Sequence, residues 1–175
     1  METARPKRKP TRLPGFDYGT KGAYFITICT VEMRCTLSSI EPFPPSGVDL
    51  PSPQPCLTQQ GAIAEKWIKA LPLSRRGLFV DLYVIMPNHI HLLLSLAEDV
   101  ALTEEQSRQT ITAAVGWLKY QITHEINKSS KTKGAPFFQR SFYDHIIRNR
   151  KDYEEIYKYI EENPKKWQLD KLYTK

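Results

Sequence analysis

The sequence lacks the features that hold a chain in a membrane or cross-link it covalently. Its three cysteines, Cys29, Cys35 and Cys56, form no CxxC pair, so we expect neither a disulfide framework nor a cysteine metal site. Its longest apolar runs, near residues 80–86 and 92–97, are far too short to cross a bilayer. The basic N-terminal residues are not followed by the apolar stretch of a secretory signal. We therefore expect a cytoplasmic protein with reduced thiols.

The sequence also shows no internal repeat and no linker that would divide it into two domains. A chain of 175 residues is long enough to bury a core without covalent staples. We expect a basic N-terminal arm at residues 1–20, followed by a single domain at residues 21–175. Six prolines lie between residues 40 and 57, a density that neither a helix nor an inner strand tolerates, so we expect a peripheral insertion at about 40–57.

Acidic residues are in the minority. The chain has 25 Lys and Arg against 19 Asp and Glu, which gives a formal net charge of +6 and favours a polyanionic partner. Five of the cations lie in the proline-containing N-terminal arm and are the candidate contacts to the phosphates of such a partner: Arg5, Lys7, Arg8, Lys9 and Arg12. Such an arm can lie along phosphates, but a solvated tail has the same composition.

Hydrophobic periodicity predicts alternating strands and helices. Runs rich in β-branched and aromatic residues predict strands at residues 22–31, 77–86, 88–95 and 137–147, the first of them central in its sheet. Capping residues and apolar stripes predict helices that start at Thr58, at the capping box of Thr103 and Gln106, and at Asp152, with a basic loop at residues 128–134. This order predicts an α+β fold, a ferredoxin-like split βαβ sandwich. Two helices would cover one face of an antiparallel sheet and leave the other face open.

The stretch at residues 83–96, YVIMPNHIHLLLSL, carries the most informative pattern. Strand alternation places His89 and His91 on one face and the intervening Ile and Leu residues on the other. Two neutral imidazoles about 7 Å apart along a strand can converge on one divalent ion, whereas the apolar face requires a covering helix. A strand whose histidines only form hydrogen bonds would have the same motif, so the motif requires support from elsewhere.

The last expected helix, which ends at Asn163-Pro164, adds a candidate nucleophile. At about 100° per residue, Tyr153 falls on its apolar stripe, while Tyr159 and Asn163 are neighbours one turn apart on the shoulder of that stripe. Attack on a phosphodiester requires a nucleophile and a Lewis acid. A tyrosine can be the nucleophile. The Lewis acid can be Mg²⁺ or Mn²⁺, held by His89, His91 and Asn163. Imidazole suits Mn²⁺ better than Mg²⁺, and zinc fits the same ligands.

These residues, in this setting, resemble the REP-associated tyrosine transposases, a bacterial branch of the single-tyrosine HUH transposases. The HUH triplet alone is a weak signal, but its occurrence among further matching blocks in this order is specific. The blocks cover most of the chain apart from the proline-rich insertion: RLPGFDYGTKGAYFITICT, YVIMPNHIHLLL, VGWLKYQITHEINK, FFQRSFYDHIIRN and YIEENPKKW.

The resemblance implies roles for four residues and a reaction. His89 and His91 would bind a divalent ion, Asn163 would complete the metal site, and Tyr159 on the C-terminal helix would be the nucleophile. Single-stranded DNA would be cleaved through a 5′-phosphotyrosine intermediate with release of a 3′-hydroxyl, and strands would be rejoined without ATP. Family members recognise imperfect palindromic hairpins, which suits the basic arm. Many relatives with this fold are dimers that share active sites, but resemblance to this branch implies that the protein acts as a monomer.

Two other interpretations remain open at this stage. A non-catalytic nucleic-acid-binding or regulatory module on the same fold would bind single strands by aromatic stacking on an open sheet. An ordinary hydrolase that uses a metal-bound water would cleave DNA without a covalent adduct. Asp144 and His145 are additional polar candidates, as supporting residues or DNA contacts, and as strand neighbours they are expected to face opposite ways.

Overall fold

The computed structural model describes residues 16–40, 55–74, 76–97, 110–130 and 134–174. Its elements follow the expected order of strand, helix, strand, strand, helix, strand, helix. The main elements are β1 (Gly22–Cys29), α1 (Gln59–Ala70), β4 (Leu78–Ile85), β5 (His89–Leu96), α2 (Ile111–Ser130), β6 (Tyr143–Ile147) and α3 (Arg150–Glu162). Short elements complete the described part: β2 (Ser38–Ser39), β3 (Cys56–Leu57), and 3₁₀ helices at Val31–Met33, Pro72–Ser74 and Pro164–Leu169.

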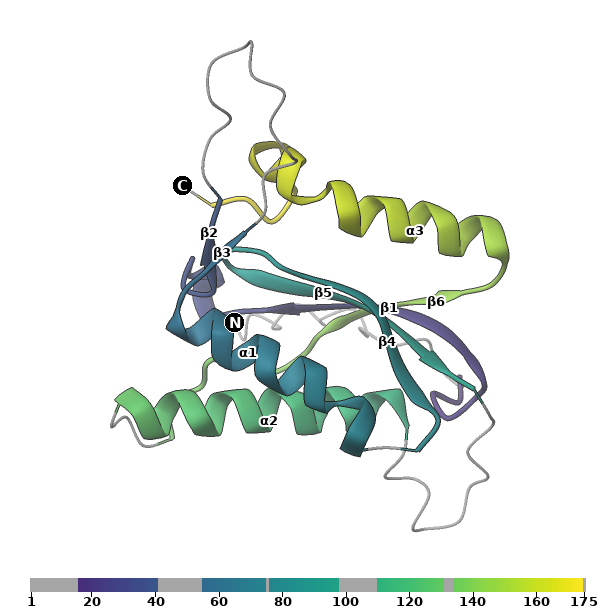
Figure 1. The fold of residues 1–175 in the computed structure, drawn as a ribbon, viewed down its shortest axis with the longest axis horizontal. Helices are drawn as coiled ribbons and strands as arrows, with labels where there is room; N and C mark the ends of the chain where they lie inside the picture. Colours follow the sequence, from purple (N-terminus) through teal and green to yellow (C-terminus); the bar gives the residue numbers. More distant parts are fainter. Residues whose placement is uncertain (1–15, 41–54, 75, 98–109, 131–133, 175) are drawn as a thin grey trace, which may run out of the picture.

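The main sheet is antiparallel, with strand order β4-β5-β1-β6, and this confirms the predicted ferredoxin-like α+β fold. Strand β1 is central, as its apolar composition predicts. Helices α1 and α2 cover one face of the sheet (Figure 1). The alternation of β5 is confirmed, because Ile90, Leu92 and Leu94 are buried in the core on this face, while the intervening histidines point the other way.

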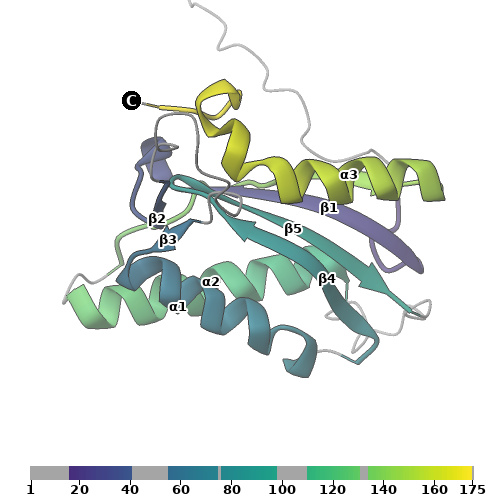
Figure 2. The same cartoon turned by 45° about the horizontal axis from the view of Figure 1, so that its top comes forward.

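The second face of the sheet is covered, so the prediction that it is open is wrong. Helix α3 lies across this face (Figure 2), and Ile160 and Trp167 pack there against Val84, Met86 and Leu93. The physical reason is that the strands also carry apolar residues on this side, and these require cover.

Helix caps agree with the sequence at one helix and differ at another. The hydroxyl of Thr58 accepts the Gly61 N–H at 3.1 Å and starts α1, as predicted. Helix α3 starts one turn earlier than predicted, because Asn149 is its cap and accepts the Asp152 N–H at 2.9 Å. The predicted capping box of Thr103 and Gln106 lies outside the described residues.

The loop predicted at residues 128–134 and the strand predicted at 137–147 are both shorter in the structure than in the prediction. Helix α2 continues to Ser130, so the loop predicted from residue 128 is wrong for its first residues. The strand predicted at 137–147 is regular only in β6. Before β6, the carbonyls of three consecutive residues accept hydrogen bonds from the ammonium group of Lys119 at 2.6 to 3.3 Å. These residues are Gln139, Arg140 and Ser141. These contacts attach this segment to α2.

The predicted arm and insertion fall mostly outside the described residues. Those parts include Arg5, Lys7, Arg8, Lys9 and Arg12. At the end of the expected arm, Phe16 and Tyr18 pack against the core. The expected insertion joins β2 to β3, which pair with each other. Among the described helices, none is long and apolar enough to span a membrane.

Candidate functional site

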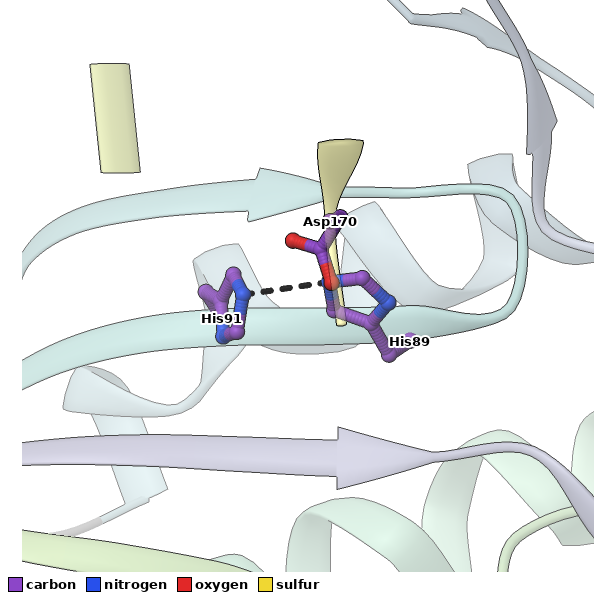
Figure 3. A group of neighbouring side chains, drawn as sticks. All are labelled: His89, His91 and Asp170. Atoms are coloured by element: carbon purple, nitrogen blue, oxygen red, sulfur yellow. Dashed lines mark hydrogen bonds between the residues drawn. The ribbon is translucent and has the colours of Figure 1, made fainter. Parts of the chain in front are cut away.

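Strand β5 turns both histidines toward α3, where they form the centre of a buried polar cluster. The side chains of His89 and His91 are almost fully buried, and their Nε2 atoms lie 3.1 Å apart (Figure 3). Each Nδ1 atom has its own partner: Asn88 Oδ1 at 2.8 Å for His89 and Thr27 Oγ1 at 2.8 Å for His91. Because Asn88 Oδ1 is an acceptor, Nδ1 of His89 carries the proton and Nε2 keeps its lone pair for another partner.

Burial keeps both rings neutral near pH 7. Desolvation lowers the pKa of His89 to about 4, against an opposing effect of the Asp170 charge. Desolvation, reinforced by the neighbouring His89, lowers the pKa of His91 well below its ordinary value. Neutral imidazoles are the form that binds metal ions.

A third donor, Asp170, was not predicted. It follows the 3₁₀ helix Pro164–Leu169, and its carboxylate and the two imidazoles offer ligand atoms that all lie within 4.8 Å of one another (Figure 3). Two imidazole nitrogens and one carboxylate oxygen are a donor set that divalent ions accept, so the cluster is compatible with a metal site. Asp170 carries no local signal, because it lies in an irregular segment outside any periodic pattern.

The two residues predicted on the last helix lie beside this cluster. The Tyr159 hydroxyl is 3.4 Å from His91 Nε2 and 3.4 Å from Asp170 Oδ2, to which it donates. Asn163 donates from Nδ2 to the same Asp170 oxygen at 2.9 Å, and its buried Oδ1 has no hydrogen-bond partner among the described residues. An unpaired buried amide oxygen is costly and is a donor that a hard cation or water would satisfy.

The environment of Tyr159 holds its hydroxyl in the protonated form. Burial and the negative charge of Asp170 raise the pKa of this phenol above its ordinary value. Tyr159 as a residue is 43% exposed, and its ring meets Phe25 edge-on, with ring centroids 5.9 Å apart. Tyr159 is therefore accessible from outside, but it requires a cation or a base to become a nucleophile.

The neighbouring candidates lie away from the cluster. Tyr153 donates to Asp81 at 3.1 Å and packs against Tyr157, as expected for a structural tyrosine. Asp144 and His145 face opposite ways, as predicted: the first accepts from Tyr18 at 2.5 Å, and the second lies 2.9 Å from the Asp152 carboxylate.

Asn88 connects the histidine strand to the segment that carries Asp170. Its Oδ1 binds His89, while its Nδ2 donates to the Leu172 carbonyl at 2.7 Å and to Thr174 Oγ1 at 3.1 Å. Asn88 is fully buried. We expected it only as part of a tight connection, because a turn preference gives no indication of partners far along the chain.

A cavity of about 560 Å³ opens beside Tyr159. It begins at His91, Asn163 and Asp170 and extends across the central strand β1 to the edge strand β6. Its remaining walls come from β1, β6, α3 and the segment after α3, and they include Phe25, Thr27, Tyr143, Ile156, Glu162, Lys166, Leu169, Lys171 and Leu172. The cluster therefore has an approach route from the surface.

Comparison with known proteins supplies relatives of this chain. No model of a known protein family matches it. A Haemophilus influenzae protein described only as uncharacterized is 31% identical over 180 residues, which cover 95% of this chain and 93% of that protein. A second protein of that organism, provisionally named a REP-associated tyrosine transposase, is 31% identical over 90 residues, 47% of each chain. A solved structure of a REP-associated tyrosine transposase bound to a REP hairpin has a TM-score of 0.58 at 24% identity, covers 84% of this chain and 68% of its own, and shares the fold.

Proposed function

We propose that this chain cleaves and rejoins single-stranded DNA. The chain belongs to one family with the uncharacterized Haemophilus influenzae protein. It is also similar to the REP-associated tyrosine transposases. The observation that carries the proposal is the position of the Tyr159 hydroxyl, 3.4 Å from both His91 Nε2 and Asp170 Oδ2. An accessible phenol beside two neutral imidazoles and a carboxylate is the combination that attack on a phosphodiester requires.

The residues of the chain divide the chemistry between them. The Tyr159 oxygen would form a bond to phosphorus while the bond from phosphorus to the 3′ oxygen breaks, which leaves a 5′-phosphotyrosine and a 3′-hydroxyl. Asp170 Oδ2 accepts the hydrogen bond of the phenol and would receive its proton, and the departing 3′ oxygen would take up one proton from solvent to become the hydroxyl. Attack by a 3′-hydroxyl on the phosphotyrosine reverses the step and frees Tyr159. No ATP is consumed, because the phosphodiester bond is exchanged and not hydrolysed.

A divalent ion, Mg²⁺ or Mn²⁺, belongs to this proposal. His89, His91 and Asp170 would hold it, and the unpaired Oδ1 of Asn163 supports the earlier assignment of that residue to the same site. The bound ion would supply positive charge that offsets the charge of the phosphate oxygens and lowers the pKa of the phenol. Two imidazoles favour Mn²⁺ over Mg²⁺.

The substrate that we propose is hairpin DNA with a single-stranded flank. This proposal draws on the relative whose solved structure contains a REP hairpin. The cations Arg5, Lys7, Arg8, Lys9 and Arg12 would add phosphate contacts. We further propose that the protein acts as a monomer in the cytoplasm.

The test is the formation of a covalent adduct. The protein is incubated with Mn²⁺ and a labelled hairpin oligonucleotide that carries a single-stranded flank, and adducts are separated on a denaturing gel. We expect an adduct with the parent protein and with Tyr157→Phe, and none with Tyr159→Phe. An adduct that survives Tyr159→Phe would refute the assignment. Cleavage without any adduct would indicate a metal-activated water, and binding without cleavage a non-catalytic module.

A further inference from the structure

The cavity beside Tyr159 has an aromatic wall that the cleavage chemistry does not use. Phe25 and Tyr143 line this wall, and Ile156 and Leu169 add apolar surface. Tyr143 is 57% exposed and Leu169 is 84% exposed, which is unusual for large apolar side chains that converge on one hollow. In the part of the chain that the structure describes, Tyr143 has no stacking partner.

The sheet register places Tyr143 at a defined distance from the cluster. Thr27 on the central strand pairs with His91 on one side and with Tyr143 on the other. The three residues thus form a row across adjacent strands, and their side chains share the face that α3 covers. With adjacent strands about 4.8 Å apart, Tyr143 lies roughly 10 Å from His91. A base attached to a phosphate at Tyr159 would reach this wall.

The edge of the cavity adds one cation that is available for a phosphate. Lys166 forms an ion pair with Glu162 at 2.6 Å, and Lys158 approaches the same carboxylate at 3.8 Å. Lys171 also lines the cavity, and no ion pair is found for it among the described residues. An aromatic wall, an apolar floor and an unbalanced cation together fit a nucleotide better than an uncharged ligand.

We propose that this cavity holds one unstacked base of the DNA strand beside the scissile phosphate, with Tyr143 and Phe25 as its stacking surface and Lys171 on the adjacent phosphate. The inference deepens the proposed function and depends on it for the identity of the strand. Binding of the base involves no covalent step. Stacking on an aromatic ring accepts every base, so the pocket would position the strand and leave sequence recognition to other contacts.

The test measures binding in a protein that cannot form the adduct. In a Tyr159→Phe background, fluorescein-labelled oligothymidylate is titrated by anisotropy over a range of salt concentrations. Tyr143→Ala should weaken binding about tenfold at every salt concentration and leave the salt slope unchanged, because a stacking contact is lost and no phosphate contact. Lys171→Gln should reduce the slope of log K against log salt by about one.

Matched variants separate stacking from folding. Tyr143→Trp and Tyr143→Phe keep a ring and should bind as the parent does. Tyr120→Ala removes another exposed tyrosine, 64% exposed on α2 at the opposite side of the sheet, and should have no effect. Equal binding by Tyr143→Ala and the parent would overturn the base pocket, as would an equal loss in Tyr120→Ala. Because the probe is not cleaved, failure of the adduct experiment would leave this result standing, and the reverse also holds.

Discussion

The two faces of the sheet are built from different chemistry. The face under α1 and α2 is closed by aliphatic side chains such as Ile90, Leu92 and Leu94, which need only shape and area to be satisfied. The face under α3 has a smaller apolar cluster next to a group of buried polar side chains: Thr27, Asn88, His89, His91 and Asn163. Buried polar groups are costly unless each has a partner. We therefore expect the face under α1 and α2 to contribute most of the free energy of unfolding. The face under α3 contains the candidate functional site.

The largest expected effect on this comparison comes from the aliphatic face. Leu92→Ala removes a fully buried side chain next to His91 and should lower the free energy of unfolding by about 2–5 kcal/mol. Urea denaturation measures the loss. Because Leu92 points away from the cluster, Mn²⁺ affinity of the folded variant should equal that of the parent. A matching drop in metal affinity would show that the two faces are not independent.

The next prediction concerns the carboxylate in the cluster. Asp170→Asn should weaken Mn²⁺ binding by at least about 10–100-fold. Loss of a residue that only supports a metal ligand already costs this much, and Asp170→Asn removes a charged ligand itself. Isothermal titration calorimetry measures the change, and chelation of the ion should abolish the adduct. Asp152→Asn is the matched control, because that carboxylate lies on the same side of the sheet but binds His145. Unchanged affinity in Asp170→Asn would remove it from the metal site.

A related effect is expected at the residue that connects the two halves of the site. Asn88→Ala should reduce Mn²⁺ affinity about 10–100-fold, because His89 loses the partner that fixes its tautomer. The same change should speed amide hydrogen exchange after Asp170, where Asn88 holds the Leu172 carbonyl. Exchange that stays slow would mean that other contacts hold this segment. Thr27→Val offers a comparison, since it removes the hydrogen-bond partner of the His91 ring and leaves that of His89 in place.

The smallest expected effect is electrostatic and lies at the start of α3. Burial raises the pKa of Asp152, but hydrogen bonds from His145 and the Arg148 N–H outweigh it, so this pKa lies below its ordinary value. A carboxylate with a lowered pKa stabilises the fold above its unfolded pKa, and this contribution disappears as the pH falls through the folded pKa. Asp152→Asn should therefore cost less than about 1 kcal/mol at neutral pH and nothing in acid. Thermal melting across pH measures the difference, and a constant cost at all pH values would contradict it.

The parts of the fold that were predictable are those with local causes. Alternation in β5 determined which face the histidines occupy, and the Thr58 cap determined the start of α1. The family resemblance drawn from short sequence blocks is also confirmed. In the first two cases neighbouring residues carry the whole signal, and the resemblance depends on several short blocks in a fixed order.

The parts that were missed depend on contacts between distant segments. Nothing near residues 139–141 indicates that Lys119 on α2 captures their carbonyls. The cover that α3 gives to the second face follows from apolar positions on separate strands, Val84 and Leu93 among them. Asp170 lies in no periodic segment, so its place beside the histidines becomes visible only in three dimensions.

The order of the site residues along the chain determines when each of them becomes available during translation. During translation the two imidazoles leave the ribosome long before the tyrosine at 159 and the carboxylate at 170. A nascent chain, or a product of a premature stop codon, would thus contain the histidine strand without the nucleophile. Under the function proposed above, strand-cutting ability would arise only after the segment that carries Asp170 has been synthesised.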